Sequence, residues 1–549
     1  MSPQINKTLE CPAPRIRERF EILTLKEKSF ALLLLVILSL LLFTAFDFSG
    51  DYAINDDWGY STPIRWWAES GQFALTQWQS MPLVTQLVAG AAWTEVFGFS
   101  QGTLRQLTLV FAVTTCAAVF ACARQLQMPF ALCLLCAVLP LASPIFVGLS
   151  YSFMADIPAA ALVMLSLLFF LRSFNKGTDG GLDYGLGVVF LLLAVLLRQT
   201  SIAVAIALVI AEPVARGVSL HRMLRNLGVL VGTVLVYVMF TKTLEGTVGL
   251  PRLYDVKTDS LLIFLGDLLA ANFGALLFSV KALLTALALF GLFALPLLPI
   301  LCAALWQNDR NYVWFAAGGA VLLTAASLGL GIGILADAGG NAITGDGLGP
   351  RLLKGASTVH PLLVGTVTAI GHFGCLCTVL AALSSTRQDN SWVHDKPLRG
   401  SLLLLVLTAV VTFGPHMAVY SAVFDRYTLL PSILLAMAVL RIVSFRGFSP
   451  VLGTISTGLG CLGLAISLTL AADFFRWQDT RYALIDQLVS TGIDPQEIDG
   501  GFEYNNLLAI LDHPDSAISM PALMGIERPV TLKHTPAPTD EIIAQAPYE

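Results

Sequence analysis

The stretch Ser29–Phe46, SFALLLLVILSLLLFTAF, carries no charged residue. A helix needs about 20 mainly apolar residues to cross the hydrocarbon core of a bilayer, so this stretch predicts a membrane span. The rest of the chain has the same character, because 56% of its 549 residues are hydrophobic and 13% are charged. Soluble proteins carry roughly 25% charged residues, so the composition predicts an all-α polytopic membrane protein.

Apolar segments recur along the chain and predict about thirteen transmembrane helices within a membrane domain at 29–472. They lie near residues 29–47, 104–122, 128–149, 157–173, 184–198, 200–215, 226–244, 281–305, 312–336, 357–383, 401–422, 427–442 and 450–472. The segments 184–198 and 200–215 could form one long helix, but Arg198-Gln199-Thr200 interrupts them. We therefore expect two spans there.

The distribution of Lys and Arg sets the expected orientation. Cytoplasmic loops carry an excess of these residues, and a chain that starts inside places most of them on short inner segments. Merging the segments 184–198 and 200–215 into one span would invert the orientation of every later span. The excess of Lys and Arg on the inner segments would then be lost. We expect a cytoplasmic tail at 1–28 and a small extracytoplasmic C-terminal region at 473–549. The expected location is the inner (plasma) membrane, with the active site on the periplasmic side.

The outer face is where sequence outside the membrane accumulates. The first outer loop, 48–103, is long and rich in Trp, and its stretches 60–70 and 82–97 predict amphipathic helices at the membrane interface. Further outer segments at 245–280 and 337–356 carry acidic and basic residues. Long ordered loops usually hold function, so we expect a functional site on this face.

Acidic residues border the spans at two outer positions. Asp56 and Asp57 lie in Asn55-Asp56-Asp57-Trp58-Gly59-Tyr60, and Asp156 opens a helix in Met154-Ala155-Asp156-Ile157-Pro158. Taken singly, the pair could be solvated loop acids, and Asp156 a helix cap stabilised by about 0.3–1 kcal/mol. A buried carboxylate without a partner is costly. We therefore predict that these acids converge, one to deprotonate an acceptor hydroxyl and the other to orient it.

Cationic residues at the same level predict an anion-binding site. Arg198 interrupts an apolar stretch, and Arg426 lies in Phe424-Asp425-Arg426-Tyr427 at the outer mouth of the twelfth expected span. Each could instead form an ion pair with a nearby acid. We favour phosphate binding, because a guanidinium fork matches the oxygens of a phosphate. Three weaker phosphate candidates are His360, Arg351 and Lys354. Their alternative roles are those of a helix-end histidine and a solvated basic loop.

The charge and the residue clusters also limit partners and cofactors. A net charge of −5 at pH 7 provides no basic surface field, so nucleic acid is not an expected partner. The outer segments contain no cluster of His and Cys. No metal ligand or cofactor is therefore assigned, although the two carboxylate sites could hold a divalent cation.

The order of these motifs resembles the GT-C class of membrane glycosyltransferases over roughly residues 29–445. The similarity is to the family 39 type, which includes protein O-mannosyltransferases and the lipid A aminoarabinose transferase. The shared features are a cytoplasmic N-terminus, a long first outer loop with an early acidic pair, Asp-Ile-Pro at the fourth span, and a late Asp-Arg-Tyr-x-Leu-x-Pro. The resemblance implies a GT-C fold.

The resemblance also implies roles for individual residues. The first acid of the family's pair is its proposed base, which points to Asp56, and Asp57 stands where the family usually has Glu. Asp156 matches the acid of the second outer loop. Arg426 and Tyr427 match a late Arg-Tyr pair near the lipid phosphate.

The expected function is therefore transfer of a sugar from a polyprenyl-phosphate-linked donor to a hydroxyl of a glycan, lipid or protein. The enzyme would be a hexosyl or pentosyl transferase. Its expected partners are the donor, the acceptor and the lipid bilayer. One rival is a transporter or flippase of lipid-linked saccharides, which should show internal symmetry and charges deep in several spans. The second rival is a non-catalytic partner in an envelope assembly. The sequence leaves the sugar and the acceptor open.

Overall fold

The computed structural model describes residues 25–71, 74–176, 180–247, 249–332, 343–344, 347–348, 360–388, 394–417, 424–444 and 449–512. Within these ranges the chain is helical apart from turns and one antiparallel ribbon, in which β1 (Ile343–Thr344) pairs with β2 (Gly347–Leu348). The prediction of an all-α polytopic membrane fold is confirmed. The expected tail at 1–28 and the expected outer segment at 337–356 lie largely outside the described residues.

The helices follow one another along the chain. The first half of the chain contains α1 (Leu25–Thr44), α2 (Asp57–Ser70), α3 (Val84–Phe97), α4 (Gln101–Gln125), α5 (Phe130–Val138), η2 (Pro140–Ala142), α6 (Pro144–Ser150), α7 (Asp156–Lys176), α8 (Gly181–Val195), η4 (Gln199–Ile202), α9 (Ala203–Arg216) and α10 (Leu220–Thr247). The second half contains α11 (Arg252–Leu269), α12 (Phe273–Phe293), η5 (Leu295–Leu297), α13 (Leu298–Asn308), α14 (Asn311–Gly329), α16 (Pro361–Gln388), α18 (Lys396–Phe413), η6 (Gly414–Met417), η7 (Asp425–Thr428), α19 (Leu429–Val443), α20 (Pro450–Ser490), η9 (Pro495–Glu497) and α21 (Phe502–Asp512).

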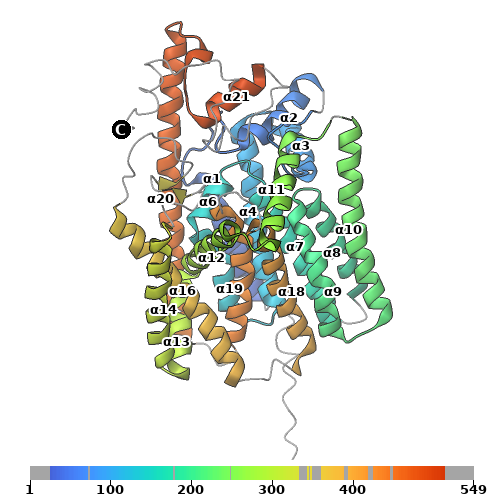
Figure 1. Cartoon of the computed structure of the whole chain (residues 1–549), viewed down its shortest axis with the longest axis vertical. Coiled ribbons are helices and arrows are strands. Elements are labelled where there is room, and N and C mark those ends of the chain that lie inside the picture. Colours follow the sequence, from blue (N-terminus) through green and yellow to red (C-terminus); the bar gives the residue numbers. More distant parts are fainter. Residues whose placement is uncertain are drawn as a thin grey trace, which may run out of the picture.

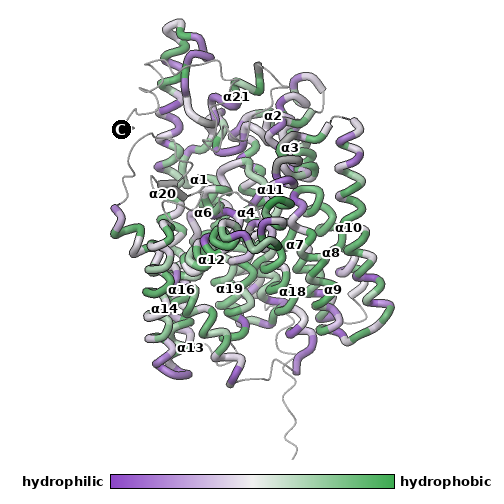
Figure 2. The backbone as a smooth tube through the Cα atoms, viewed as in Figure 1, coloured by the Kyte–Doolittle hydropathy of each residue, from purple (hydrophilic) through white to green (hydrophobic). Residues whose placement is uncertain are grey.

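Ten of the described helices are long and apolar enough to cross a membrane. An eleventh span results if the bent pair Phe130–Ala142 and Pro144–Ser150, with 70° between its members, counts as one. Three shorter apolar helices accompany them: Ser29–Thr44, Gly181–Val195 and Leu295–Asn308. Figure 2 shows hydrophobic residues through the middle of the molecule and hydrophilic residues gathered at two ends, as expected of a chain that crosses a bilayer.

Two expected boundaries differ from the structure. The expected span 281–305 is two helices, because α12 ends at Phe293 and α13 begins at Leu298. Pro296 and Pro299 cause the break, since proline lacks the N–H that a continuous helix needs. The expected boundary at residue 472 falls inside α20, which runs on to Ser490 without a proline or glycine to end it. The expected break after 184–198 is present, as η4 separates α8 from α9.

The centre of the bundle is formed by α4, α7 and α19. These helices are largely buried, whereas α10 and α14 expose most of their length. α7 packs on α4 and α8, and α18 packs on α9 and α19. Figure 1 shows α2, α3 and α21 together at one end of the molecule, beyond the bundle. This end therefore holds the segment that we expect to form the first outer loop, together with α21.

The helix pair α12 and α16 shows how small residues allow close packing in this bundle. A Cβ atom added to Gly291 of α12 would lie 1.7 Å from the carbonyl oxygen of Gly371 in α16. One added to Gly374 would lie 2.5 Å from the carbonyl oxygen of Gly291. Helices in membranes associate through such close backbone approach, because lipid is as apolar as a leucine side chain.

The two helices expected in the first outer loop are present as α2 and α3. α3 buries Gln86, whose side-chain amide donates to the carbonyl of Phe153 at 2.8 Å. It exposes Val88, Val96 and Phe97 instead. α3 also buries Leu87 and exposes Glu95, so both of its sides mix polar and apolar residues. The exposed apolar side chains suit a helix at the membrane interface.

Candidate active site

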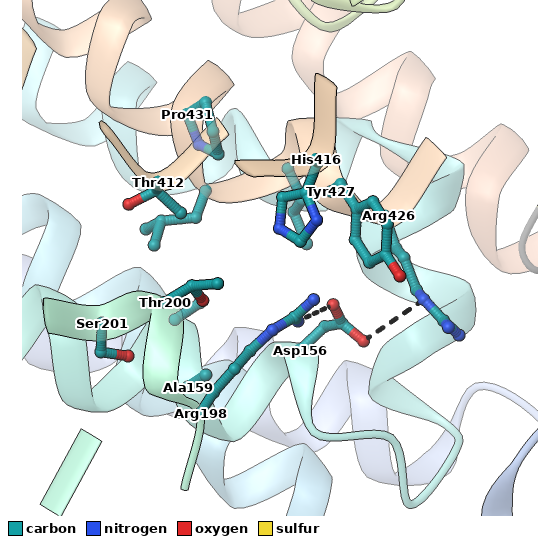
Figure 3. A pocket seen from close by; sticks show the side chains of 13 residues that line it. Asp156, Ala159, Arg198, Thr200, Ser201, Thr412, His416, Arg426, Tyr427 and Pro431 are labelled. Atoms are coloured by element: carbon teal, nitrogen blue, oxygen red, sulfur yellow. Dashed lines mark hydrogen bonds and ion pairs between the residues drawn. The ribbon is translucent and has the colours of Figure 1, made fainter. Parts of the chain in front are cut away.

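Four segments that are distant in the chain bring charged side chains to one pocket. Asp156 begins α7, and Arg198 stands in the break between α8 and η4. Arg426 belongs to η7, ahead of α19, and Asp56 directly precedes α2. Asp156, Arg198 and Arg426 line the pocket (Figure 3). Asp56 does not line it but pairs with Arg426.

These charged residues form one ion-pair network. The Nη1 of Arg426 lies 3.2 Å from Asp56 Oδ2, and its Nε lies 4.0 Å from Asp156 Oδ2. Asp156 Oδ1 accepts a hydrogen bond from Arg198 Nη1. Asp56, Asp156 and Arg426 are 6%, 7% and 8% exposed. Charges withdrawn from water persist only when paired, and here Arg426 serves both carboxylates at once.

The local sequence explains why Asp156 and Arg198 point into this pocket. Asp156 opens α7, where the helix dipole favours a carboxylate, and Pro158 fits the first turn because its missing N–H is not needed there. The backbone of Arg198 is extended, with φ −145° and ψ 117°, and this ends α8. The N–H groups of Leu83 and Val84 donate to carbonyls just before the break. The backbone carbonyl groups that the break leaves without helical partners therefore accept hydrogen bonds from the start of α3.

Aromatic rings cover the two arginines. Tyr427 stacks on His416 with ring centroids 3.8 Å apart and an interplanar angle of 18°. The guanidinium carbons of Arg198 and Arg426 lie 5.4 and 5.6 Å from the centre of the Tyr427 ring. Both distances allow cation–π attraction. Figure 3 shows the rings of His416 and Tyr427 beside the charged network.

The pocket has a charged side and an apolar side. The apolar side consists of Ala159 and Ala160 of α7 together with Leu429, Leu430 and Pro431 around the start of α19. A ligand with an ionic head and a hydrocarbon chain would match both sides. In the described part of the chain, no group of three or more His, Cys, Asp and Glu side chains could hold a metal ion.

Asp57 follows Asp56 in the chain but binds elsewhere. Its Oδ1 accepts the backbone N–H of Phe153 at 2.8 Å, and its side chain is fully buried. Among the described residues its Oδ2 has no hydrogen-bond partner. Burial, partly offset by the charge of Arg105, raises the pKa of Asp57 to about 7. Asp57 thus joins the first outer loop to the turn before α7.

A third cation, Lys257 of α11, stands close to the network. Its Nζ donates to Ser80 Oγ at 2.6 Å. Burial lowers the pKa of Lys257, and the neighbouring charges of Arg426 and Arg198 lower it further. An ammonium has three N–H donors, and the hydroxyl of Ser80 takes one of them. The ammonium therefore keeps donor capacity for an anionic ligand.

The structure brings most of the sequence-predicted site residues together. Those that meet at the pocket or pair with its lining are Asp56, Asp156, Arg198, Arg426 and Tyr427. His360 does not line the pocket. It is exposed ahead of α16, where its Nδ1 accepts the N–H of Leu362 at 3.2 Å, so it is the helix-end histidine of the alternative. Arg351 and Lys354 lie outside the described residues.

Three residues near the network were not predicted as site residues from the sequence. His416 and Lys257 are described above, and Tyr60 of α2 is buried beside Asp56. Burial, and next the charge of Asp56, raises the pKa of the Tyr60 hydroxyl, which therefore stays protonated. A signal for Lys257 was present, because a lysine in an apolar helix of an outer segment needs a polar partner.

Part of the chain matches the model of a known protein family. Residues 80–244 match the sequence profile of the family described as dolichyl-phosphate-mannose-protein mannosyltransferase. The match confirms the resemblance to membrane glycosyltransferases that the motifs indicate. It covers α3 to α10 and includes Asp156 and Arg198. No curated protein matches the chain.

Three solved structures are similar to the chain, each with low sequence identity and a low TM-score. The protein O-mannosyltransferase Pmt1-Pmt2 complex of S. cerevisiae bound to the sugar donor matches 42% of this chain and 35% of its own, with 13% identity and a TM-score of 0.35. This chain thus spans about a third of the length of the yeast protein. ArnT from Cupriavidus metallidurans matches 87% of this chain and 84% of its own, with 14% identity and a TM-score of 0.38. The oligosaccharyltransferase AglB from Archaeoglobus fulgidus matches 84% and 58%, with 13% identity and a TM-score of 0.41.

Proposed function

We propose that this chain transfers a sugar from a polyprenyl-phosphate-linked donor to an acceptor hydroxyl at the extracytoplasmic face of the membrane. The observation that carries the proposal is the ion-pair network at one pocket, in which Arg198 and Arg426 pair with Asp56 and Asp156. Lys257 stands near this network, where it donates to Ser80. The cations suit a phosphate, and the carboxylates suit an acceptor hydroxyl. The match of residues 80–244 supports the same chemistry.

The donor would bind with its phosphate against the charged side of the pocket. Arg198 and Arg426 present guanidinium groups there, and the ammonium of Lys257 stands nearby on Ser80. The hydrocarbon chain of the donor would leave along Leu430 and Pro431 toward the bilayer. The head and the tail of a polyprenyl phosphate thus find chemically matched surfaces in one pocket.

The acceptor hydroxyl would be activated by Asp56. As Asp56 takes the proton, the acceptor oxygen forms a bond to the anomeric carbon of the sugar. The bond from that carbon to the phosphate oxygen breaks, and its electron pair leaves with the polyprenyl phosphate. Arg426 and Arg198 stabilise the charge that develops on the departing phosphate. Direct displacement inverts the anomeric centre, and Asp156 holds both arginines in position.

The shared position of Arg426 orders these events. In the resting site its Nη1 is paired with Asp56 at 3.2 Å. A bound phosphate would compete for the guanidinium and release Asp56 to act as a base. Donor binding would therefore precede activation of the acceptor.

The test is sugar transfer by the purified protein in liposomes. The probe is polyprenyl-phosphate mannose with a radiolabelled sugar, and polyprenyl-phosphate aminoarabinose serves as a second donor. An extract of envelope glycans, lipids and proteins supplies the acceptors. We expect transfer by the wild type, and a loss of about 100-fold or more in Asp56→Asn and Asp156→Asn, because a positioned base typically contributes 10²–10⁴-fold.

The control variant is Glu69→Gln, which changes an exposed carboxylate in α2 that pairs with Arg65. It should transfer label like the wild type. If Asp56→Asn and Asp156→Asn do so as well, the catalytic assignment is wrong. If the labelled donor crosses the bilayer without any transfer, the protein is a lipid-linked saccharide transporter instead.

A further inference from the structure

The backbone that leads to Asp56 is held from two sides. From the bundle, the fully buried Arg105 of α4 donates to the carbonyls of Phe48, Gly50 and Tyr52, at 2.9 Å and 2.6 Å for the first two. From the opposite side, the C-terminal helices α20 and α21 contact the same segment. Residues 48–55 therefore lie between α4 and a part of the chain more than 400 positions away.

Three contacts tie the C-terminal helices to this segment. The hydroxyl of Tyr52 donates to Asp479 Oδ1 at 2.6 Å, and its ring stacks on Tyr482 with centroids 4.7 Å apart. Further along, Trp58 packs with Ile510 of α21 in a small apolar cluster. Figure 1 shows α21 beside α2 at the same end of the molecule. α20 and α21 thus contact the segment before α2 and the start of α2 at several points.

The contact nearest to the site is made by Glu503 of α21. Its side chain is fully buried, and Oε1 accepts the backbone N–H of Asn55 at 3.3 Å. Its Oε2 accepts hydrogen bonds from both terminal nitrogens of Arg481, at 3.3 and 3.2 Å. A carboxylate buried to this degree needs such partners, and here one of them is the residue just before Asp56.

We propose that Glu503 is a positioning residue, which fixes the backbone at Asn55 and so places the carboxylate of Asp56 against Arg426. The proposal deepens the proposed function and rests on it, because Asp56 is the base of that reaction. Asn55 is the pivot, with φ of 55° in the left-handed region that costs most residues energy. A charged acceptor on its N–H holds this conformation, and the Arg481 pair holds the acceptor.

The geometry gives the C-terminal helices a task in catalysis beyond covering the outer face. A 1 Å misplacement of a catalytic group can cost about 100-fold in rate. Loss of the Glu503 contact would therefore lower kcat, while the phosphate-binding residues Arg198 and Arg426 keep their places. The affinity for the donor phosphate should change little.

The test compares Glu503→Ala, the charge-swapped double variant Glu503→Arg with Arg481→Glu, and the control Tyr504→Phe. The swap restores the ion pair but leaves the N–H of Asn55 without an acceptor. The control removes only the bond from the Tyr504 hydroxyl to the carbonyl of Pro495. Each protein is assayed for transfer from polyprenyl-phosphate mannose, for binding of polyprenyl phosphate, and for amide hydrogen exchange in the peptide covering residues 51–58.

We expect kcat to fall about 10- to 100-fold in Glu503→Ala and in the swap, with the Kd for polyprenyl phosphate within about twofold of wild type. Exchange at 51–58 should accelerate in both and stay unchanged in Tyr504→Phe. Full recovery of kcat by the swap would overturn the proposal, because the ion pair alone would then suffice. So would unchanged exchange at 51–58 in Glu503→Ala. If the wild type transfers no sugar while exchange responds as expected, the proposed function fails and the positioning contact stands.

Discussion

The carboxylate of Asp56 lies 3.2 Å from the guanidinium of Arg426, although 370 residues separate them in the chain. The same arginine faces Asp156 at 4.0 Å. One cation thus joins the two acids that a sugar transfer would use, and it lies where the donor phosphate would bind. In the proposed reaction the site is charge-paired at rest and becomes reactive when the phosphate draws Arg426 away from Asp56.

The two neighbouring acids should respond differently to substitution. Asp56→Asn removes the proposed base and should lower sugar transfer about 100-fold or more. Asp57→Asn keeps a carbonyl oxygen that can accept the N–H of Phe153, so transfer should stay within about fivefold of wild type. The measurement is kcat for labelled sugar transfer in liposomes.

Thermal unfolding in detergent serves as the control for this pair, since both variants should fold. Equal losses of activity in the two variants would contradict the division of roles. A larger loss in Asp57→Asn than in Asp56→Asn would assign the base to Asp57.

The stability of the protein should carry a signature of Asp57 in its pH dependence. Its pKa is about 7 in the folded protein, above the value of about 3.9 in an unfolded chain. A carboxyl with a raised pKa contributes stability that is fully present below the unfolded pKa and is lost as the pH rises through the folded value. The wild type should therefore lose stability from about pH 4 to about pH 7, by at most about 1.4 kcal/mol per pH unit from this group.

Asp57→Asn cannot titrate and should lack this part of the decline. The measurement is the unfolding midpoint in detergent at a series of pH values, for wild type and variant side by side. Only the difference between the two curves reports on Asp57, because other groups titrate in both. Parallel curves would show that the carboxyl keeps its ordinary pKa.

Much of the architecture could be predicted from the sequence, because lipid imposes a simple rule on composition. Apolar segments that cross the bilayer as single chains form helices, and the few charged residues within or beside them need partners. Arg198 is predicted in this way because it interrupts an apolar stretch, and Asp156 and Arg426 because each stands at the end of one. The break at Arg198 was predicted for the same reason and is present between α8 and η4.

The remaining features depend on contacts between distant parts of the chain, which no local pattern records. The bond from Glu503 to Asn55 spans 448 residues, and the approach of Lys257 to Ser80 spans 177. Asp56 and Asp57 illustrate a second limit. Adjacent positions at a helix start point in different directions, and the sequence does not say which direction faces the site.

Lys257 should matter for the donor phosphate. Lys257→Met keeps the length of the side chain and removes the charge, and binding of polyprenyl phosphate should weaken about 10-fold or more, the value of one charge-assisted hydrogen bond. The pKa of Lys257 is lowered, so the ammonium loses its proton earlier than an exposed lysine as the pH rises. Binding by the wild type should therefore weaken with rising alkalinity.

The measurement is a titration with polyprenyl phosphate at several pH values. Lys242→Met is the matched control, because Lys242 is exposed and pairs with Glu245 away from the site. It should bind like the wild type. An unchanged Kd in Lys257→Met would exclude the lysine from the phosphate site.

The packing of α12 on α16 predicts a strong effect of one methyl group. In Gly291→Ala the new Cβ would lie 1.7 Å from the carbonyl oxygen of Gly371, which is backbone and cannot move aside alone. The helices must separate, and overpacking of this kind costs typically about 1–3 kcal/mol, and more when backbones collide. Gly318→Ala in α14 is the control, since a Cβ there meets nothing within 4 Å. We expect the unfolding midpoint in detergent to drop clearly in Gly291→Ala and to hold or rise in Gly318→Ala, where alanine favours the helix. Equal midpoints in the two variants would mean that α12 and α16 are not in contact at Gly291.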